Sequence, residues 1–493
     1  MSMRRDFVLP CWCSRVFGAV GPEISRRDRP RAFASPRHGL APHHAKRTFR
    51  RLPTLCAFAS LALLAARAAW ALPAVEVQRD FTITAGNAFF DQGPSLGIVC
   101  TFNFGDPTGA YNILTGYNAA HIYQTPGTYQ MTLSRIGEPD FVKTIHVVPD
   151  KRGVQTLQKG DILADVIRGV KNDTVVLLPP GATFDIISPI EVKSRNVEFR
   201  AAPGEGPMPR IRKIYGGKAS NSLILHGLDI TFRGIEFDSD RDMKKHGDGK
   251  VNIRGITADT AHVVLDHCAF RNVDDAIFCT TVTRGLLVQN CKFTNEVRSC
   301  DVWAGGADLV LLGNTMATSE HEHNCRQSYP GFYNMLVYEN EMHATHGKET
   351  LTFRLGQDLY ASHNLFDGWL RLGPGPRGDH RPMSPEELQR AFVRYVVIER
   401  NAFIGRAATI QINEGTSEAI IRYNRLDTDS VGVPIRAQGP SLHDIVLDGN
   451  YRVLTAGAND KPIFRGWGIG PNDIIEKNSS TKTAAEAEQL KGE

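Results

Sequence analysis

The sequence lacks a hydrophobic stretch long enough to span a membrane comfortably. The apolar run at residues 52–66 is shorter than the ~20 residues that a membrane-spanning helix needs. It follows an Arg-rich segment that is poor in acids, residues 1–51, and it ends shortly before Ala69-Trp70-Ala71. Small residues at −3 and −1 after such a run predict a secretory signal peptide cleaved after Ala71. We therefore expect residues 1–71 to be a signal peptide with a basic N-terminal extension. The mature protein is expected to be secreted or periplasmic, without membrane contact.

The chain also lacks an excess of basic over acidic residues once residues 1–71 are left out. Residues 1–71 contain 13 of the 57 lysines and arginines and 3 of the 53 acidic residues. The rest of the chain has 44 basic and 50 acidic side chains and a formal charge of −6, although the whole chain carries +4. The mature chain thus lacks the basic footprint of a nucleic-acid-binding protein. Any positive charge must be local, as a cleft for an anionic sugar would require.

The chain contains few cysteines, and those after residue 71 do not have the spacing of zinc ligands. Six of the nine cysteines follow residue 71, and no two of them form a CxxC pair. An exported protein could pair some of them in disulfides, but their positions favour buried thiols. No cofactor is firmly implied. The spacing of Asp238, Asp240 and Asp242 could hold Ca²⁺, although Gly249 replaces the final EF-hand ligand and a plain acidic loop is favoured.

Residues 76–149 have the pattern of short strands joined by turns. The stretch 126–133 alternates apolar and polar residues, as a half-buried strand does. Phe102-Asn103-Phe104-Gly105-Asp106 is followed by His121-Ile122-Tyr123 and Pro126-Gly127-Thr128-Tyr129. In these motifs the segment resembles a PKD domain. The resemblance implies a seven-stranded, Ig-like β-sandwich of the kind attached to secreted glycan-active enzymes, with no catalytic residues of its own.

Internal repetition is the strongest signal in the remaining chain. An Asn shortly before an apolar residue, just after a β-branched run, recurs mostly at intervals of 23–26 residues. The repeated asparagines are Asn290, Asn314, Asn340, Asn364, Asn401, Asn424 and Asn450. A coil of about two dozen residues with three short strands can stack at ~4.8 Å and bury an apolar ladder. Asn in a repeated left-handed turn can bond to the Asn of the next coil.

The repeat predicts a right-handed parallel β-helix over residues 156–470, followed by a polar tail at 471–493. Leucine-rich repeats would need a different Leu pattern, and propeller blades need ~40 residues each. Residues 156–172 are amphipathic and predict a helix that caps the first coil. The fold class is therefore all-β, an Ig-like sandwich followed by a parallel β-helix.

Two neighbouring coils, residues 321–329 and 346–354, are unusually polar. Leu351 and Phe353 are expected to point inward, which leaves Lys348, Thr350, Thr352 and Arg354 on the outer face by the period of two. Cys325 is likewise expected inward, with Glu322, Asn324 and Arg326 outward. Lys348 and Arg354 are about 20 Å apart along a straight strand, so they can contact one sugar only if Lys348 lies on the turn.

This set of side chains suits β-elimination on a uronate. The reaction needs a cation at the carboxylate, a task for which Arg has bidentate geometry, and a base that removes the C5 proton. Arg354 or Arg326 nearby would favour the neutral amine of Lys348. At these residues the chain resembles the pectate lyase-like polysaccharide lyases of the alginate lyase and chondroitinase B-like group. The resemblance implies a base role for Lys348 and a carboxylate-binding role for Arg354.

The lysine lacks the family's Asn-Lys-Ser context, because Gly347-Lys348-Glu349 stands there. His321, His323 and Tyr329 therefore remain candidates for the base. The predicted substrate-binding residues are Arg326, Glu322, Asn324, His346, Arg371 and Arg377. Arg377 lies in the 374–390 segment, a loop expected to form a wall of the cleft.

The leading hypothesis is a secreted lyase acting on an alginate-like, uronic-acid-containing polysaccharide. A mannuronan-type C5-epimerase would share the proton abstraction. A polygalacturonase-like hydrolase would use Asp274, Asp275 and Asp301 as paired carboxylates, but its downstream Arg-x-Lys run is missing. A non-catalytic glycan-binding solenoid, with the PKD-like module as spacer, is the third alternative. The expected partner is an anionic polysaccharide.

Overall fold

The structure is a computed structural model of the whole chain. It describes residues 80–93, 97–216, 220–241, 253–294, 300–319, 323–327, 331–344, 348–374, 386, 392–404, 409–427, 433–439, 441–453, 462–470, 473–483 and 486–487. The predicted signal peptide and its cleavage site lie outside these residues. Within them, no helix is both long and apolar enough to cross a membrane.

The first part of the described chain is a β-sandwich of two sheets. One sheet has the order β1 (Asp80–Thr84), β7 (Phe141–Val148), β6 (Gly127–Ser134), β3 (Cys100–Asn103) and β4 (Ile113–Gly116), and the other pairs β2 (Ala88–Asp91) with β5 (Ala119–Ile122). The motif residues meet in its core. The rings of Phe104 and His121 stack at 4.8 Å, His121 lies 3.1 Å from Asp106, and Tyr123 donates a hydrogen bond to the Phe104 carbonyl. The expected seven-stranded sandwich is confirmed.

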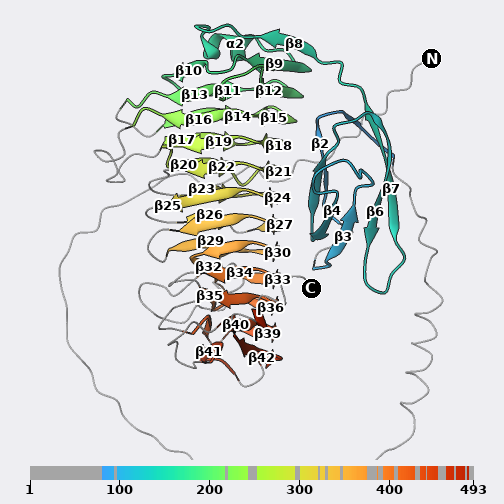
Figure 1. Cartoon of the computed structure of the whole chain (residues 1–493), viewed down its shortest axis with the longest axis vertical. Helices are drawn as coiled ribbons and strands as arrows, with labels where there is room; N and C mark the ends of the chain where they lie inside the picture. The colour runs from blue at the N-terminus through green and yellow to red at the C-terminus, as the bar shows by residue number, and fades with distance from the viewer. Residues whose placement is uncertain are drawn as a thin grey trace, which may run out of the picture. The chain divides into compact units, whose positions relative to one another are not determined.

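The second part is a right-handed parallel β-helix, as the repeat predicts (Figure 1). Each coil contributes one strand to each of three parallel sheets, which we number I, II and III in chain order. In the described residues, sheet I contains β8 (Gly153–Thr156), β9 (Thr174–Leu178), β12 (Val197–Ala201), β15 (Ile230–Arg233), β18 (Ala261–Asp266), β21 (Arg284–Gln289), β24 (Ala307–Leu312), β27 (Phe332–Tyr338), β30 (Gly356–Ser362), β33 (Val393–Glu399), β36 (Ser417–Arg422), β39 (His443–Asp448) and β42 (Ile474–Lys477).

Sheets II and III follow the same stacking order. Sheet II contains β10 (Thr183–Ile186), β13 (Arg210–Lys213), β16 (Glu236–Ser239), β19 (Ala269–Arg271), β22 (Lys292–Thr294), β25 (Thr315–Ser319), β28 (Glu341–Ala344), β31 (Leu365–Asp367), β34 (Ala402–Ile404), β37 (Arg425–Asp427), β40 (Tyr451–Val453) and β43 (Ser480–Lys482). Sheet III contains β11 (Ile190–Val192), β14 (Ser220–Leu225), β17 (Ile253–Ala258), β20 (Asp275–Cys279), β23 (Cys300–Ala304), β26 (His323–Gln327), β29 (Glu349–Phe353), β32 (Trp369–Leu372), β35 (Thr409–Asn413), β38 (Ile435–Gln438) and β41 (Phe464–Trp467).

The ends of the solenoid differ from expectation. The capping helix α2 (Leu163–Gly169) is shorter than the predicted 156–172 segment; Leu163 and Ile167 are buried, whereas Ile162 is exposed. At the other end, β42 and β43 lie within residues 471–493, where a polar tail was expected. Ile474 of β42 pairs with Ile445 of the preceding coil. The expected boundary at residue 470 is therefore too early.

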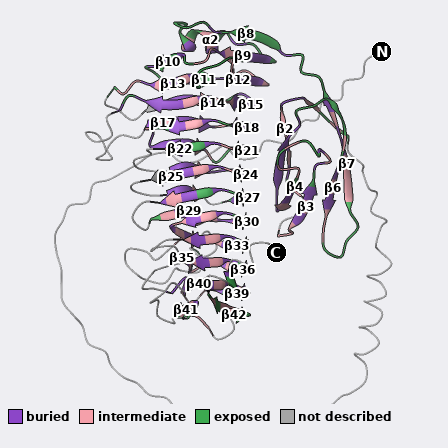
Figure 2. Ribbon diagram, in the orientation of Figure 1, coloured by how far each residue is buried: buried purple, intermediate pink, exposed green. Residues whose placement is uncertain are grey.

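Stacked apolar side chains from all three sheets fill the interior of the solenoid, and its strands are mostly buried or half-buried (Figure 2). Phe237, Phe270 and Phe293 of sheet II stack ring on ring at 4.9–5.0 Å. The six cysteines after residue 71 are buried free thiols, as expected, and Cys325 and Cys279 belong to this core. In such a stack each coil contacts only the coils next to it, so the core extends along the solenoid axis.

The asparagine ladder forms at the turn between sheets I and II. The Nδ2 group of each ladder asparagine donates to Oδ1 of the next, at 2.8–3.1 Å, from Asn314 through Asn450. Two details differ from the sequence prediction. The left-handed residue precedes each ladder asparagine, as His363 does with φ 59°. Asn290 is itself such a left-handed residue, and Cys291 occupies the ladder position, where its backbone N–H donates to Asn314.

We predict that Asn364→Ala destabilises the solenoid by on the order of 3 to 5 kcal/mol. The side chain donates to the carbonyls of Val337 and Ser362 and to Asn401, and it accepts from Asn340; alanine leaves all of these buried groups without this partner. Urea unfolding measures the loss. The exposed Asn172, whose Oδ1 accepts one backbone N–H, is the control, and its alanine variant should lose about 1 kcal/mol or less. Equal losses for the two variants would contradict the ladder's role.

The sandwich and sheet I share a hydrophobic cluster within one compact unit, residues Glu76–Glu493. Val264, Leu287, Val310 and Leu336 project from sheet I into this cluster. Polar contacts surround it: Gln92 donates to Asp308 at 2.6 Å, and the Gly97 N–H donates to Asp358 at 2.7 Å. The outer face of sheet I between β18 and β33 is thus covered by apolar contacts. A loosely attached spacer would not bury these side chains, so this feature argues against the spacer role.

Candidate functional site

The outer face of sheet III carries the polar residues of the two coils singled out in the sequence. Its inward positions are apolar, as Val302, Cys325 and Leu351 are. The residue after each of them points outward, and the strand registers align these residues in one row along the solenoid. We call this set the outer row; its members are Phe278, Trp303, Arg326, Thr352, Arg371, Gln411, Arg436 and Arg465.

Guanidinium groups lie over aromatic rings along this face. The Arg326 guanidinium carbon lies 4.6 Å from the ring centre of Trp303 in the preceding coil. Arg254, which forms an ion pair with Asp275, lies 3.6 Å over the Phe278 ring of the following coil. Stacking of this kind holds a guanidinium in place without neutralising its charge. The row therefore combines flat apolar surfaces with fixed positive charge, a combination that suits an anionic sugar chain.

His323 lies at the centre of the two polar coils and is buried. Burial is the main cause that lowers the pKa of its imidazole, and the positive charges of Arg326, Arg354, Arg371 and Lys348 act in the same direction; together they bring the pKa to about 2. The imidazole is therefore neutral at any physiological pH. Its 3.6 Å contact with Glu349 is consequently not an ion pair, because the ring carries no charge.

Thr352 and Glu349 connect His323 to the arginines. The Thr352 hydroxyl shares a hydrogen bond of 2.9 Å with His323 Nδ1. Glu349 forms an ion pair with Arg371 at 2.6 Å, and Arg371 also donates to Gln411 at 3.1 Å. Arg371 is thus oriented from two sides while remaining partly exposed. Its position in the outer row is compatible with the substrate-binding role predicted for it.

Lys348 and Arg354 flank strand β29 at its two ends. Lys348 is exposed and directly precedes the strand, and Arg354 directly follows it and is half-buried. Both are close enough to His323 to lower its pKa. Lys348 therefore lies off the strand, which is the condition under which the two cations can serve one sugar.

Further along the same face, a small pocket opens at the outer row. It has a volume of about 310 Å³ and is lined by Gln411, Arg436, Gln438 and Trp467. Arg465 lies 4.8 Å over the Trp467 ring. The polar and aromatic character of the outer row thus extends across several coils beyond Arg371, as an elongated substrate would require.

Several predicted site residues lie outside the described part of the chain. They are His321, Tyr329, Glu322, His346 and Arg377. Of the others, His323, Arg326 and Arg371 lie on strands β26 and β32 of sheet III, and Lys348 and Arg354 flank β29 near enough to His323 to lower its pKa.

Asn324 departs from the expected outward position. Its side chain is fully buried, and Nδ2 donates to Asp301 at 2.8 Å and to the Met316 carbonyl at 3.4 Å. The amide therefore ties the start of β26 to the preceding coil and to the strand before it. Buried in this way, Asn324 cannot contact a substrate, and its assignment as a substrate-binding residue is corrected.

The carboxylates of the hydrolase alternative are buried as well. Asp274 accepts hydrogen bonds from Arg241 and from the backbone N–H of Ile253, and burial raises the pKa of its carboxyl group. Asp275 pairs with Arg254. Asp301, which accepts from Asn324, is also fully buried. Inverting and retaining hydrolases both need two carboxylates facing the sugar, so this trio does not provide the required geometry.

The acidic loop near Asp238 does not assemble a cation site in the residues that the structure describes. Asp238 lies 3.5 Å from Arg210 and accepts from Asn272, and Asp240 accepts the Tyr215 N–H. Asp242 lies outside the described residues. No group of three His, Cys, Asp or Glu side chains converges as metal ligands in the described ranges.

Sequence reasoning missed the aromatic and distal members of the outer row. Phe278, Trp303, Gln411 and Arg436 are spread over four separate coils, and each looks unremarkable in its own stretch. Each of these residues directly follows an inward, apolar residue of its coil. An alignment of the coils on those inward residues would have placed the four residues in one column. The signal was present, but only in the comparison between coils.

No protein-family model and no curated protein matches the chain. Among solved structures it is similar to the A-module of a mannuronan C-5 epimerase from Azotobacter vinelandii, with a TM-score of 0.44 and 12% identity over 65% of this chain and 93% of that module. It is also similar to an alginate lyase from Paenibacillus sp., with a TM-score of 0.30 and 14% identity over 66% of this chain and 95% of the lyase. The Dettilon tailspike protein matches with a TM-score of 0.43 and 11% identity, over 67% of this chain and 68% of the tailspike. Likeness at this level concerns the fold alone.

Proposed function

We propose that this protein is a secreted polysaccharide lyase that cleaves an alginate-like, uronic-acid-containing glycan by β-elimination. One observation carries the proposal: four cationic side chains, of Arg326, Lys348, Arg354 and Arg371, all lie near enough to the buried, neutral His323 to lower its pKa, and two of them, Arg326 and Arg371, share the outer row by register. A cluster of guanidiniums beside an exposed amine matches the two demands of this reaction, which are a bound carboxylate and a nearby base.

In the proposed mechanism, the arginines bind the sugar carboxylate. Arg326 and Arg371 project from coils two apart, separated by ~10 Å of stacking, with Arg354 at the end of the strand between them. A guanidinium stabilises the charge that the carboxylate gains as the C5 proton leaves. Trp303, whose ring stacks against the Arg326 guanidinium, offers an apolar surface for the sugar ring.

Lys348 is the proposed base. In its uncharged form the amine takes the C5 proton, the electron pair of the C5–H bond forms the C4=C5 double bond, and the C4–oxygen bond breaks, with the leaving oxygen taking a proton from water. His323 is unsuited to this role, because a group with a pKa of about 2 binds a proton too weakly near neutral pH. His321 and Tyr329 stay alternative proton carriers.

The N-terminal sandwich is proposed to be a PKD-like module, on the strength of its motif residues. The contacts among Phe104, Asp106, His121 and Tyr123 support this assignment. Cleavage after Ala71 is proposed to yield a mature protein that is secreted or periplasmic.

The test is incubation of the purified protein with oligomannuronate, oligoguluronate and oligogalacturonate. Ultraviolet absorbance reports the C4=C5 double bond, and we expect it to rise with at least one of these substrates. Exchange of the C5 proton with solvent deuterium without absorbance would replace the lyase by an epimerase. Release of reducing ends without absorbance would contradict elimination altogether.

A further inference from the structure

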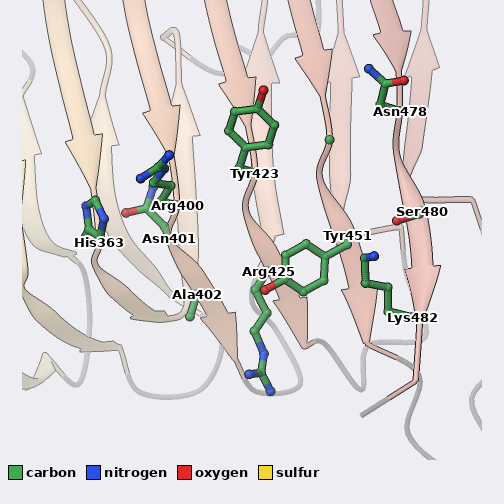
Figure 3. Close-up of a pocket in the computed structure, with 11 residues that line it drawn as sticks. His363, Arg400, Asn401, Ala402, Tyr423, Arg425, Tyr451, Asn478, Ser480 and Lys482 are labelled. Carbon is green, nitrogen blue, oxygen red and sulfur yellow. The ribbon is translucent and has the colours of Figure 1, made fainter. Parts of the chain in front are cut away.

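A second pocket lies on another edge of the solenoid, at the turn between sheets I and II. Its volume is about 580 Å³, and its lining includes His363, Arg400, Tyr423, Arg425, Tyr451 and Lys482 (Figure 3). None of these residues belongs to sheet III. The pocket is therefore separate from the proposed cleavage site.

Two aligned rows of residues build this pocket. His363, Arg400 and Tyr423 are the left-handed residues that directly precede successive ladder asparagines. The first residues of the sheet II strands, including Arg425 and Tyr451, form the second row by register. The buried ladder beneath them fixes both rows, so the pocket is built on rigid backbone.

The aromatic rings provide flat surfaces in this pocket. Tyr423 is 47% exposed, and Gly449 of the next coil leaves room for its ring, since a Cβ at that glycine would lie only 2.7 Å from the ring. The Lys482 ammonium lies 6.0 Å from the ring centre of Tyr451. Figure 3 shows the Tyr451 ring between Lys482 and Arg425 in this view.

The charge in the pocket is positive. Arg400, Arg425 and Lys482 line it, and no carboxylate is among its described lining residues. Arg425 pairs with Asp427 at 2.6 Å, which fixes the guanidinium, and Arg400 is exposed. The positive charge of Arg400 also lowers the pKa of His363, next to the main effect of burial. Cations beside tyrosine rings suit a ligand with a carboxylate on an otherwise apolar ring face.

We propose that this pocket is a second glycan-binding site, which holds a carboxylated sugar unit of the polysaccharide away from the point of cleavage. The choice of a uronate as ligand rests on the proposed function. A polymer held at both sites would gain avidity without any further contact at the cleavage site.

The test is calorimetric binding of oligomannuronate to a Lys348→Ala parent, in which turnover is expected to be about 10²- to 10⁴-fold slower. Adding Arg400→Gln and Tyr423→Asn should weaken binding at one class of sites by about tenfold or more; asparagine tolerates the left-handed backbone at residue 423. Tyr423→Phe should retain binding. Arg195→Gln, an exposed arginine at a distant turn, is the matched control and should match the parent. Melting temperatures verify that each variant is folded.

Unchanged stoichiometry and affinity in the double variant would overturn the proposal, as would equal binding of a neutral cello-oligosaccharide. The result is independent of the lyase assignment, because binding is measured without product formation. If the wild-type protein produced no unsaturated sugar while the pocket variants still lost binding, the proposed reaction would fail and this site would stand.

Discussion

Replacement of Lys348 by alanine is expected to lower kcat for elimination by about 10²- to 10⁴-fold, the usual contribution of a general base. Lys348 is exposed at the start of β29, beside the arginines that are proposed to hold the carboxylate. Those arginines are unaffected by the substitution, so the affinity for oligouronates should change little. Initial rates of unsaturated product and calorimetric binding, measured on the same preparation, separate the two effects.

Lys292→Ala is the matched control for this prediction. Lys292 is an exposed lysine on β22 of sheet II, away from the outer row of sheet III, and its alanine variant should turn over substrate at the parent rate. A Lys348→Ala variant with undiminished kcat would remove Lys348 from the chemistry and return the base role to His321 or Tyr329.

His323→Gln is expected to make the protein more resistant to acid. In the unfolded chain the imidazole takes up a proton near its ordinary pKa of 6.5, whereas the folded protein keeps it neutral until about pH 2. The unfolded state therefore binds more protons throughout this window, so folded stability is full above about pH 6.5 and declines as the pH falls. At about pH 4.5 the loss due to this one group is about 2 to 3 kcal/mol.

Urea unfolding at pH 7.5 and at pH 4.5 measures this difference, because glutamine cannot titrate. The parent should lose about 2 to 3 kcal/mol more than the variant between the two conditions. His443→Gln changes a histidine that is 60% exposed and should leave the parent's pH dependence intact. An identical pH dependence in parent and His323→Gln would show that the imidazole is protonated in the folded state.

The fold could be predicted because the repeat is visible in the sequence as asparagines at regular intervals. A period of two dozen residues requires stacked coils, and the asparagines from Asn314 to Asn450 form the ladder that their chemistry suggests. The prediction was wrong at Asn290. Cys291 occupies the ladder position in that coil, and Asn290 is the left-handed residue before it. Asparagine favours both positions, so residue type alone could not distinguish them.

The end of the solenoid was harder to predict. The last coil ends in the short strands β42 and β43, in which Ile475 and Thr481 are exposed. Exposed side chains give the end coil a mixed pattern, and among the described residues no strand pairs beyond it. A polar composition therefore suggested a tail where the backbone continues to pair.

The candidate site followed from alternation only in part, because Thr350 and Thr352, expected on the outer face, are fully buried. Period two correctly placed Arg326 outside and Cys325 inside. It failed at Asn324, at the entry to β26, where the chain turns from sheet II and the side chain bonds back to Asp301. Asp274 and Asp301 are likewise buried because neighbouring coils cover them. Their burial could not be predicted from the residues next to them in the sequence.

The most direct test of the account is the structure of the Lys348→Ala variant with bound oligomannuronate. The account predicts a sugar on the outer face of sheet III, with its carboxylate within hydrogen-bonding distance of at least one of Arg326, Arg354 and Arg371, and with C5 facing the position vacated by the Lys348 amine. A sugar bound only elsewhere on the solenoid, or with its carboxylate directed away from these arginines, would contradict it.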